Sequence, residues 1–258
     1  MSRYRGVAGI ARQVPKRHRG VDGVARSITK SYRGVDGVAR QFFSSGVPVG
    51  ELAVGESVYI DVDGVSKEFL VVHQGNPDTA MYDASCNGTW LLMKDAYLSM
   101  VWNSTSSHDY RFSSLHYYLR DTFPTLLSPS IQSAIKSVKI PYYKGTTTNG
   151  TTEVGSNGLA VKIFALSEGE LGNGTYDGVL GAKLSYFQDK TKRIAYHNGS
   201  TVWWWTRNPY YSAINRCYCV MDTGEIGSVT VNSKYYARPA FILDSNTLVD
   251  PQTHKIIG

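Results

Sequence analysis

Cysteine is scarce in this chain, with three residues among 258. Cys86 stands alone. Cys217 and Cys219 are two residues apart, so on a strand they share one face and are poor partners for each other. Thiols this few and this irregularly spaced exclude a disulfide framework. We therefore expect synthesis in a reducing cytoplasm, without export by the usual route.

Long apolar runs are also missing. No stretch of the sequence approaches the length of a membrane span. The Arg-rich start lacks the hydrophobic segment of a signal peptide. The sequence therefore predicts no membrane insertion.

Catalytic signatures are missing as well. The six histidines are His18, His73, His108, His116, His197 and His254. They form no His-x-x-x-His pair and no zinc-ligand spacing with cysteine. No phosphate loop, dinucleotide fingerprint or nucleophile elbow occurs. Glu168 and Glu170 lie near a turn, and their spacing is no evidence for a glycosidase pair. We expect a protein that is not an enzyme and has no cofactor.

What the chain has instead is a repeat of fourteen residues at its amino terminus. Tyr4 to Arg12 reads YRGVAGIAR, His18 to Arg26 reads HRGVDGVAR, and Tyr32 to Arg40 reads YRGVDGVAR. A unit this short cannot close a core, so it must stack on copies of itself or lie against another molecule. Repeats of this kind are more typical of large assemblies than of enzymes.

The positive charge of the chain belongs to this arm, residues 1–46. The arm holds ten Lys or Arg and two acids, a net charge of +8, whereas the remaining 17 basic and 19 acidic residues give −2. A basic arm can bind nucleic acid or an acidic protein surface, or can be a solvated tail. Because its basic residues alternate with Val, Ile and Gly in fixed register, we favour a protein surface and disfavour nucleic acid. The candidate assembly residues are Arg5, Arg12, Arg19, Arg26, Arg33 and Arg40.

Each repeat carries a hairpin signal at its centre. Asp-Gly tolerates the positive φ angles of a two-residue turn, and β-branched residues flank it. The pattern predicts a short β-meander with about seven residues per strand. Because a meander with so few apolar side chains is marginal in water, we expect it to become ordered on docking.

Residues 47–258 are long enough to form one domain with a sizeable core. Strands are expected over residues 57–62, 68–73, 90–93, 162–166 and 240–243. Ser113 to Thr122 and Ser128 to Lys139 have apolar residues at helical spacing, and each begins with a capping serine. These segments predict a domain that contains both strands and two helices.

Several motifs of this domain occur in a particular order: Trp90 to Met93 (WLLM), the two helices, Lys162 to Ser167 (KIFALS), Trp203 to Arg207 (WWWTR) and Ala237 to Phe241 (ARPAF). That order resembles an uncharacterised domain family common in gut Gram-positive bacteria and their prophages, over roughly residues 50–246. The closing pattern is similar to the end of C-type-lectin-like domains, including the ligand-binding ends of phage tropism proteins diversified by retroelements. The Arg-Gly-Val-Asp-Gly-Val-Ala-Arg repeat resembles arms on phage and prophage structural proteins.

The resemblance implies an α+β fold: a C-type-lectin-like domain with two small antiparallel sheets and two helices, after a short β-repeat arm. Such folds carry a loop-rich face that varies without disturbing the core. Here that face would come from residues 206–236, where Tyr supplies contact area and Asn and Arg supply hydrogen bonds. The candidate ligand-binding residues are Asn208, Tyr210, Tyr211, Asn215, Arg216, Tyr218, Asn232, Tyr235 and Tyr236. Alternatively, several of these aromatic residues simply pack the domain.

The Trp triplet and two arginines are expected to belong to the core. Trp203 and Trp205 would share one face of a strand, with Trp204 on the other. Arg207 and Arg238 would satisfy buried carbonyls or carboxylates rather than bind a ligand. The lectin resemblance also raises calcium, but no acid or amide precedes Asn208-Pro209, and Trp102-Asn103 is followed by Ser104, so the oxygen ligands that sugar-binding members use are not visible. We therefore expect no metal.

Together these expectations describe a non-enzymatic structural protein of a bacteriophage virion, made in the host cytoplasm: a tail, tail-fibre or head-decoration component. The arm would anchor it to other virion proteins, and the lectin-like domain would bind a host-surface glycan or protein in host attachment. A homo-oligomer is expected in the particle, where many copies amplify weak sites. Two alternatives stay open: a virion adaptor or decoration protein whose loop face binds another virion protein, and a bacterial surface binding module.

Overall fold

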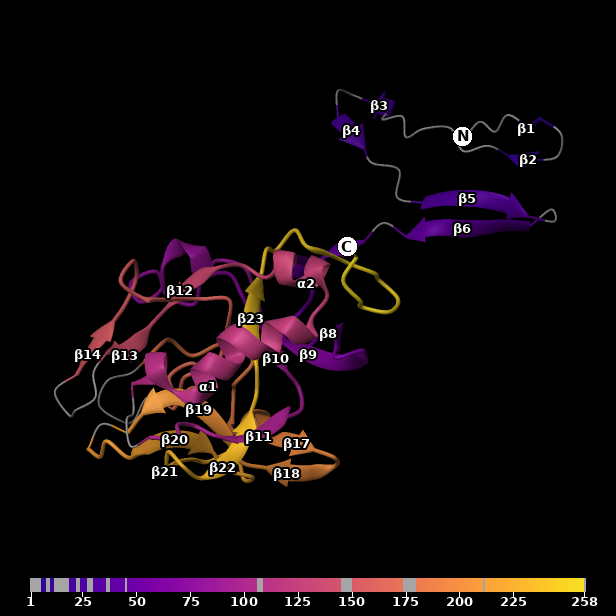
Figure 1. Ribbon diagram of the computed structural model, residues 1–258. Helices are drawn as coiled ribbons and strands as arrows, with labels where there is room; N and C mark the ends of the chain where they lie inside the picture. Colours follow the sequence, from indigo (N-terminus) through magenta and orange to yellow (C-terminus); the bar gives the residue numbers. More distant parts are fainter. Residues whose placement is uncertain are drawn as a thin grey trace.

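The chain after the arm is built mainly from β-strands. The computed structural model describes residues 46–105, 109–144, 150–173, 180–210 and 212–257, and the backbone of the strands between residues 6 and 44. Within these ranges lie two five-stranded sheets, with two-stranded sheets around them (Figure 1). The first sheet has the order β16-β23-β10-β9-β8 and consists of β8 (Ser57–Val62), β9 (Val65–Gln74), β10 (Thr89–Met93), β16 (Ile163–Phe164) and β23 (Ala240–Leu243).

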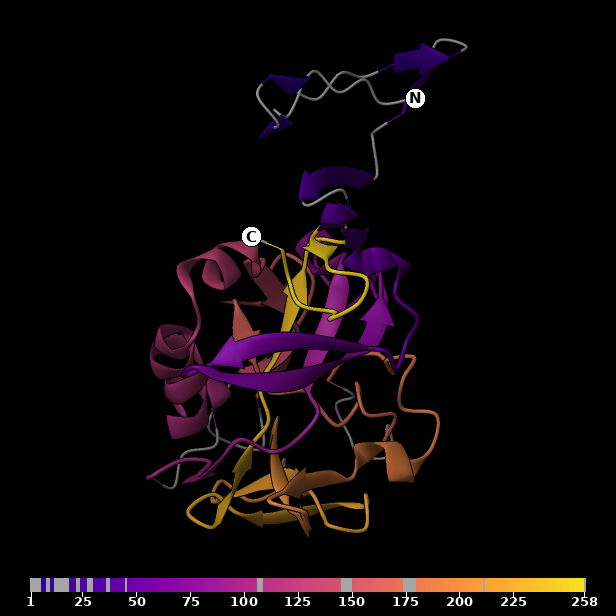
Figure 2. The same ribbon diagram turned by 90° about the vertical axis from the view of Figure 1, so that its right-hand side faces the viewer.

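The second sheet has the order β11-β22-β19-β20-β21. It consists of β11 (Leu98–Val101), β19 (Trp204–Pro209), β20 (Arg216–Val220), β21 (Ile226–Thr230) and β22 (Lys234–Ala237). The small sheets of the domain pair β7 (Val47–Pro48) with β24 (Leu248–Val249), β12 (Val138–Ile140) with β15 (Leu159–Val161), β13 (Tyr142–Lys144) with β14 (Thr151–Glu153), and β17 (Ala195–His197) with β18 (Ser200–Val202). Figure 2 shows the second sheet below the first, with β19 to β22 in orange and yellow.

Strand positions in the first sheet follow the sequence closely. The expected strands at 57–62 and 240–243 are β8 and β23, and those at 68–73 and 90–93 lie within β9 and β10. Val62 pairs with Val65, so Asp63 and Gly64 form the two-residue turn between β8 and β9, with φ angles of 51° and 71°. Positive φ at both positions is what this hairpin turn requires, and the Asp-Gly signal is confirmed here.

Both faces of the central strands β10 and β23 are buried. In β10, Leu91 and Met93 belong to one hydrophobic cluster, and Trp90 and Leu92 belong to a second cluster on the opposite face. β23 alternates in the same way, which explains why these strands read as continuous apolar runs. The domain therefore has two cores, separated by its sheets.

The Trp triplet follows this alternation. Trp205 packs in the first cluster with Trp203 against it, and Trp204 packs in the second, so the expected division of the three rings is confirmed. Cys217 and Cys219 both lie on β20 and both face the first cluster, as their spacing predicts.

The expected α+β fold, a C-type-lectin-like domain with two small antiparallel sheets and two helices, is wrong. The domain is mostly β, and its second sheet is mixed, because β19 runs parallel to β22 with Trp204 opposite Tyr236. In the described ranges a single helical run is longer than two turns. It covers residues 114–126 as α1 (Ser114–Tyr117), a π turn (Tyr118–Thr122) and a 3-10 turn (Phe123–Leu126), and it lies on one side of both sheets (Figure 2).

The second expected helix, Ser128 to Lys139, ends early. Ser128 caps α2 (Pro129–Ala134) by accepting a hydrogen bond from the Ile131 backbone N–H, as its position indicates. The chain then becomes extended, and Val138–Ile140 forms β12 against β15. Val138 and Ile140 are β-branched and alternate around a polar residue, and in this tertiary context strand pairing prevails over the helical spacing.

The repeat arm forms three hairpins that share one register. They pair β1 (Gly6–Val7) with β2 (Ile10–Ala11), β3 (Arg19–Val21) with β4 (Val24–Arg26), and β5 (Lys30–Val35) with β6 (Val38–Ser44). Val7 pairs with Ile10, Val21 with Val24 and Val35 with Val38, which leaves a two-residue connection in each repeat. The hairpin prediction is confirmed. The meander is not, because the described strands pair only within a repeat.

Candidate functional site

The residues of the expected loop face do not lie on one surface. Asn215 and Asn232 are exposed, whereas Asn208 and Tyr218 are buried. The Asn208 side chain accepts a hydrogen bond from the Glu168 backbone N–H over 2.9 Å, so it fixes a turn of the scaffold. Neither buried side chain is available to a ligand.

The other candidate ligand-binding residues also lie in different parts of the fold. Tyr235 and Tyr236 are neighbours on β22, so Tyr235 packs towards the first cluster and Tyr236 towards the second. Tyr210 and Arg216 are half-buried at one end of β20, where the Arg216 guanidinium lies 6.0 Å from the Tyr210 ring centroid. Tyr211 lies outside the described residues, as do Arg5 and Arg12 of the arm. Binding by the exposed and half-buried members stays a prediction.

Arg207 anchors a buried polar cluster, as expected of a scaffold residue. Its guanidinium donates to both carboxylate oxygens of Glu170, over 2.6 and 2.7 Å, and to the carbonyls of Pro141 and Ala165. The Tyr82 hydroxyl donates to the same carboxylate over 2.8 Å. Both charges of the pair are fully buried. The cluster is closed to solvent and holds segments together.

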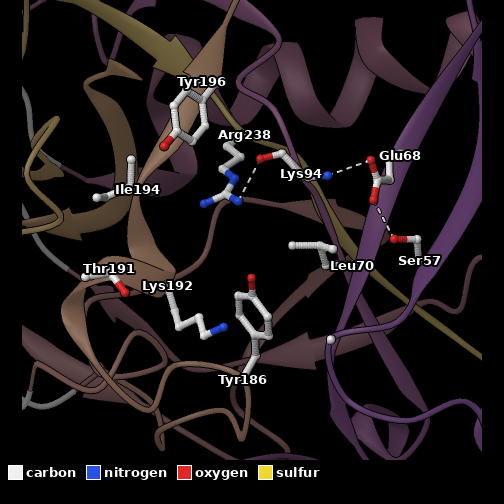
Figure 3. Close-up of a pocket in the computed structure, with 11 residues that line it drawn as sticks. Ser57, Glu68, Leu70, Lys94, Tyr186, Thr191, Lys192, Ile194, Tyr196 and Arg238 are labelled. Carbon is white, nitrogen blue, oxygen red and sulfur yellow. Dashed lines mark hydrogen bonds and ion pairs between the residues drawn. The ribbon is translucent and has the colours of Figure 1, made fainter. Parts of the chain in front are cut away.

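An open groove of about 420 Å³ lies elsewhere in the domain (Figure 3). One wall comes from Ser57 on β8 and Glu68 on β9, and the other from residues 186–196. Arg238, in the two-residue connection between β22 and β23, lies between these walls. The groove thus forms where the connection between the two sheets passes close to the edge of the first.

Arg238 is held at the base of the groove by backbone carbonyls. Its Nε donates to the Met93 carbonyl and its Nη2 to the Lys94 carbonyl, each over 2.8 Å. Its guanidinium lies 4.8 Å from the centroid of the Trp204 ring, a cation–π contact. Burial lowers the pKa of Arg238 to about 10, so it stays charged at neutral pH. Among the described residues no carboxylate forms an ion pair with it.

A short 3-10 turn, Lys190–Arg193, brings Lys192 to the groove. Asp189 caps this turn by accepting a hydrogen bond from the Thr191 backbone N–H over 2.8 Å. The turn directs Arg193 inward, where its Nε donates to the Leu171 carbonyl, and leaves Lys192 exposed. The Lys192 Nζ lies 5.4 Å from the centroid of the Tyr186 ring. The capped turn therefore directs Arg193 into the interior, where its role is structural, and leaves Lys192 facing the groove.

Two tyrosines and an ion pair complete the walls. The backbone N–H of Tyr186 is fixed to the Val72 carbonyl over 3.0 Å, and Tyr196 on β17 is 47% exposed. In Figure 3 the hydroxyl of Tyr186 points towards Arg238. Lys94 pairs with Glu68 over 2.9 Å. Burial raises the pKa of Glu68, but hydrogen bonds from Ser57 and Lys94 outweigh it and keep the carboxyl ionised.

A family model described as a domain of unknown function (DUF6273) matches residues 87–245. The chain belongs to the DUF6273 family. No curated protein and no solved structure matched the chain.

The DUF6273 segment carries most of the groove. Lys94, Tyr186, Lys192, Tyr196 and Arg238 lie within it, whereas the wall formed by β8 and β9 precedes it in the sequence. The sequence correctly predicted that Arg238 contacts carbonyls, but it did not predict the groove. The residues of the groove come from five separate segments, and the one local signal for it is the basic run from Lys190 to Arg193.

Two further findings concern the described part of this DUF6273 protein. Within it, no group of three or more His, Cys, Asp or Glu side chains is placed to hold a metal ion. No helix in that part is long and apolar enough to cross a membrane.

Proposed function

We propose that this chain is a non-enzymatic component of a phage or phage-derived particle. Its repeat arm attaches it to neighbouring virion subunits, and its β domain binds a ligand on the host surface. The DUF6273 match by itself indicates no particular activity. The proposal therefore rests on the arm, with the groove as support for a binding role of the domain.

The observation that carries the proposal is the repetition of one basic hairpin in one register. Arg19 lies opposite Arg26 in the ladder, and Arg33 lies opposite Arg40. Like charges at directly opposite positions weaken an isolated two-stranded ladder, and such a ladder is marginal in water even without them. An acidic partner surface removes that repulsion, so the arm is suited to docking.

The domain supports the second half of the proposal. It is compact, its interior polar cluster is closed, and its groove is open and lined by positive charge and aromatic rings. These are features of a binding surface. Many copies on one particle convert weak single sites into firm attachment.

The test of the arm uses the full chain and particles that lack it. Changing Arg19, Arg26, Arg33 and Arg40 to Gln is expected to abolish co-sedimentation with the particles. The matched control changes four exposed lysines of the domain to Gln: Lys144, Lys183, Lys234 and Lys255. Equal co-sedimentation of both variants would contradict anchoring by the arm.

The test of the domain is a cryo-electron-microscopy reconstruction of the assembled particle, together with host adsorption. We expect the groove to face solvent, and added free chain to inhibit adsorption of particles to host cells. A domain face buried against another virion protein, with adsorption unchanged, would make the chain an adaptor or decoration protein. Absence from any particle would leave a bacterial surface binding module.

A further inference from the structure

We infer that the groove between β8–β9 and residues 186–196 binds a saccharide that carries an acidic group. This inference rests on the proposed function, because it names the class of host-surface ligand that the domain would bind. It depends on three features of the groove: its charge, its aromatic walls and its size.

The groove carries a net positive charge, whereas the domain as a whole carries a net negative charge. Lys94, Lys192 and Arg238 line it with Glu68 as the single carboxylate, so its formal charge is +2, whereas residues 47–258 together carry −2. Glu68 is already occupied by Lys94 and Ser57. Among the described residues, Lys192 and Arg238 have no ion-pair partner. Asp95 and Asp189 act on Arg238 and Lys192 only at a distance, so a ligand anion in the groove would be their direct counter-charge.

The buried guanidinium strengthens this argument. A charged group removed from water is costly unless it is paired, and carbonyl dipoles compensate only part of that cost. All three guanidinium nitrogens of Arg238 donate to backbone carbonyls, those of Met93, Arg193 and Lys94, so Arg238 contributes its charge to the groove rather than a bidentate pair. Arg238 lies at the base of an open groove, but it is only 1% exposed, so its charge attracts an anion from beneath while the exposed Lys192 contacts the ligand.

The aromatic walls indicate a sugar rather than a bare anion. Tyr186 and Tyr196 each offer a ring, suited to the C–H face of a sugar, and a hydroxyl that can bond a sugar hydroxyl. The two residues lie on opposite sides of Arg238 in Figure 3. A volume of about 420 Å³ falls within the range of about 300–1,000 Å³ usual for small-ligand sites. It fits a short glycan segment, and a protein partner needs a far larger surface.

The acidic group can be a carboxylate or a phosphate, and the experiment distinguishes them. The full chain, labelled with ¹⁵N, is titrated in an NMR experiment with trigalacturonate, with glucose 6-phosphate and with neutral maltotriose. We expect one of the two acidic probes to bind at least ten-fold more tightly than maltotriose, and to shift the signals of Lys192, Tyr196 and Arg238. Affinity should fall as salt is raised.

Matched variants connect the binding to the groove. Lys192→Gln is expected to weaken binding of the acidic probe at least five-fold, and Lys183→Gln, which also changes an exposed lysine, is expected to leave it unchanged. Tyr196→Ala should weaken binding and Tyr196→Phe should retain part of it. Tyr117→Ala, an exposed tyrosine on the helical run, is the control.

Two results would overturn the inference: maltotriose binding as tightly as both acidic probes, or an affinity that Lys192→Gln does not change. Failure here leaves the arm test untouched, because co-sedimentation with particles does not use the groove. Conversely, a chain that binds the acidic probe but no particle keeps the inference and loses the virion role.

Discussion

The buried carboxylate of Glu170 joins three segments of the chain. It accepts hydrogen bonds from Arg207, Tyr82 and the Ser167 backbone N–H, all in the interior. Removing one member of a buried ion pair leaves the other charge without compensation, which costs about 3–5 kcal/mol. We predict a loss of this size in the free energy of unfolding for Glu170→Gln, measured by urea denaturation.

The control for that variant is Asp121→Asn. Asp121 pairs with Arg120 over 2.6 Å on the surface, with both side chains about half exposed. Ion pairs of this kind contribute little. The unfolding midpoint should not change measurably, and similar shifts in the two variants would refute the distinction between the buried and the exposed pair.

Glu168 makes stability depend on pH. Burial raises the pKa of Glu168 to about 7 from its ordinary 4.5. The folded state therefore holds a proton that the unfolded state releases, and this contribution is full below pH 4.5 and lost as the pH rises through 7. The effect reaches up to about 3 kcal/mol. We predict that Glu168→Gln loses less stability than the wild type between pH 5 and pH 8.

The wild type must be compared with Glu168→Gln because His116 changes the pH dependence of stability in the opposite direction. Burial lowers the pKa of His116 to about 4 from its ordinary 6.5, so its contribution is lost as the pH falls below 6.5. The difference between wild type and Glu168→Gln cancels this term. An identical pH dependence in both proteins would show that Glu168 does not hold the proton.

At the level of elements, the helical run depends on one buried serine. The Ser113 Oγ accepts a hydrogen bond from the His116 backbone N–H over 3.0 Å and donates one to the Tyr110 carbonyl over 2.8 Å. Loss of a helix cap and of a buried partner costs about 1–2 kcal/mol. We predict that loss in urea denaturation for Ser113→Ala. Ser133→Ala, which removes an exposed hydroxyl on α2, should change stability much less.

The elements differ in how far the sequence predicts them. The β8–β9 hairpin was predictable because the Asp-Gly turn and flanking strands are local signals. Val138 to Ile140 was misassigned because its strand exists only through pairing with β15, a partner distant in the sequence. The groove was missed for the same reason, since Lys192 and Arg238 meet through tertiary structure alone.

At the level of the whole molecule, the two cores should unfold together. Cys86 lies in the second cluster, and Cys217 and Cys219 lie in the first. Burial raises the pKa of all three thiols, to about 12 for Cys86 and Cys219, so none reacts in the folded state. Because both clusters share the same sheets, we predict that all three become reactive at one urea concentration, measured by iodoacetamide pulses and mass spectrometry. Earlier reaction of Cys86 alone would indicate independent cores.

The position of β23 has a consequence for synthesis on the ribosome. This strand comes near the end of the sequence, yet it lies between β10 and β16, and the following β24 pairs with β7 at the start of the domain. A nascent chain that stops before Ala240 exposes the facing edges of β10 and β16 with no strand between them. Unpaired edges of that kind invite association between chains. Translation must therefore pass Leu243 before the first sheet can close, and products truncated before β23 should be aggregation-prone.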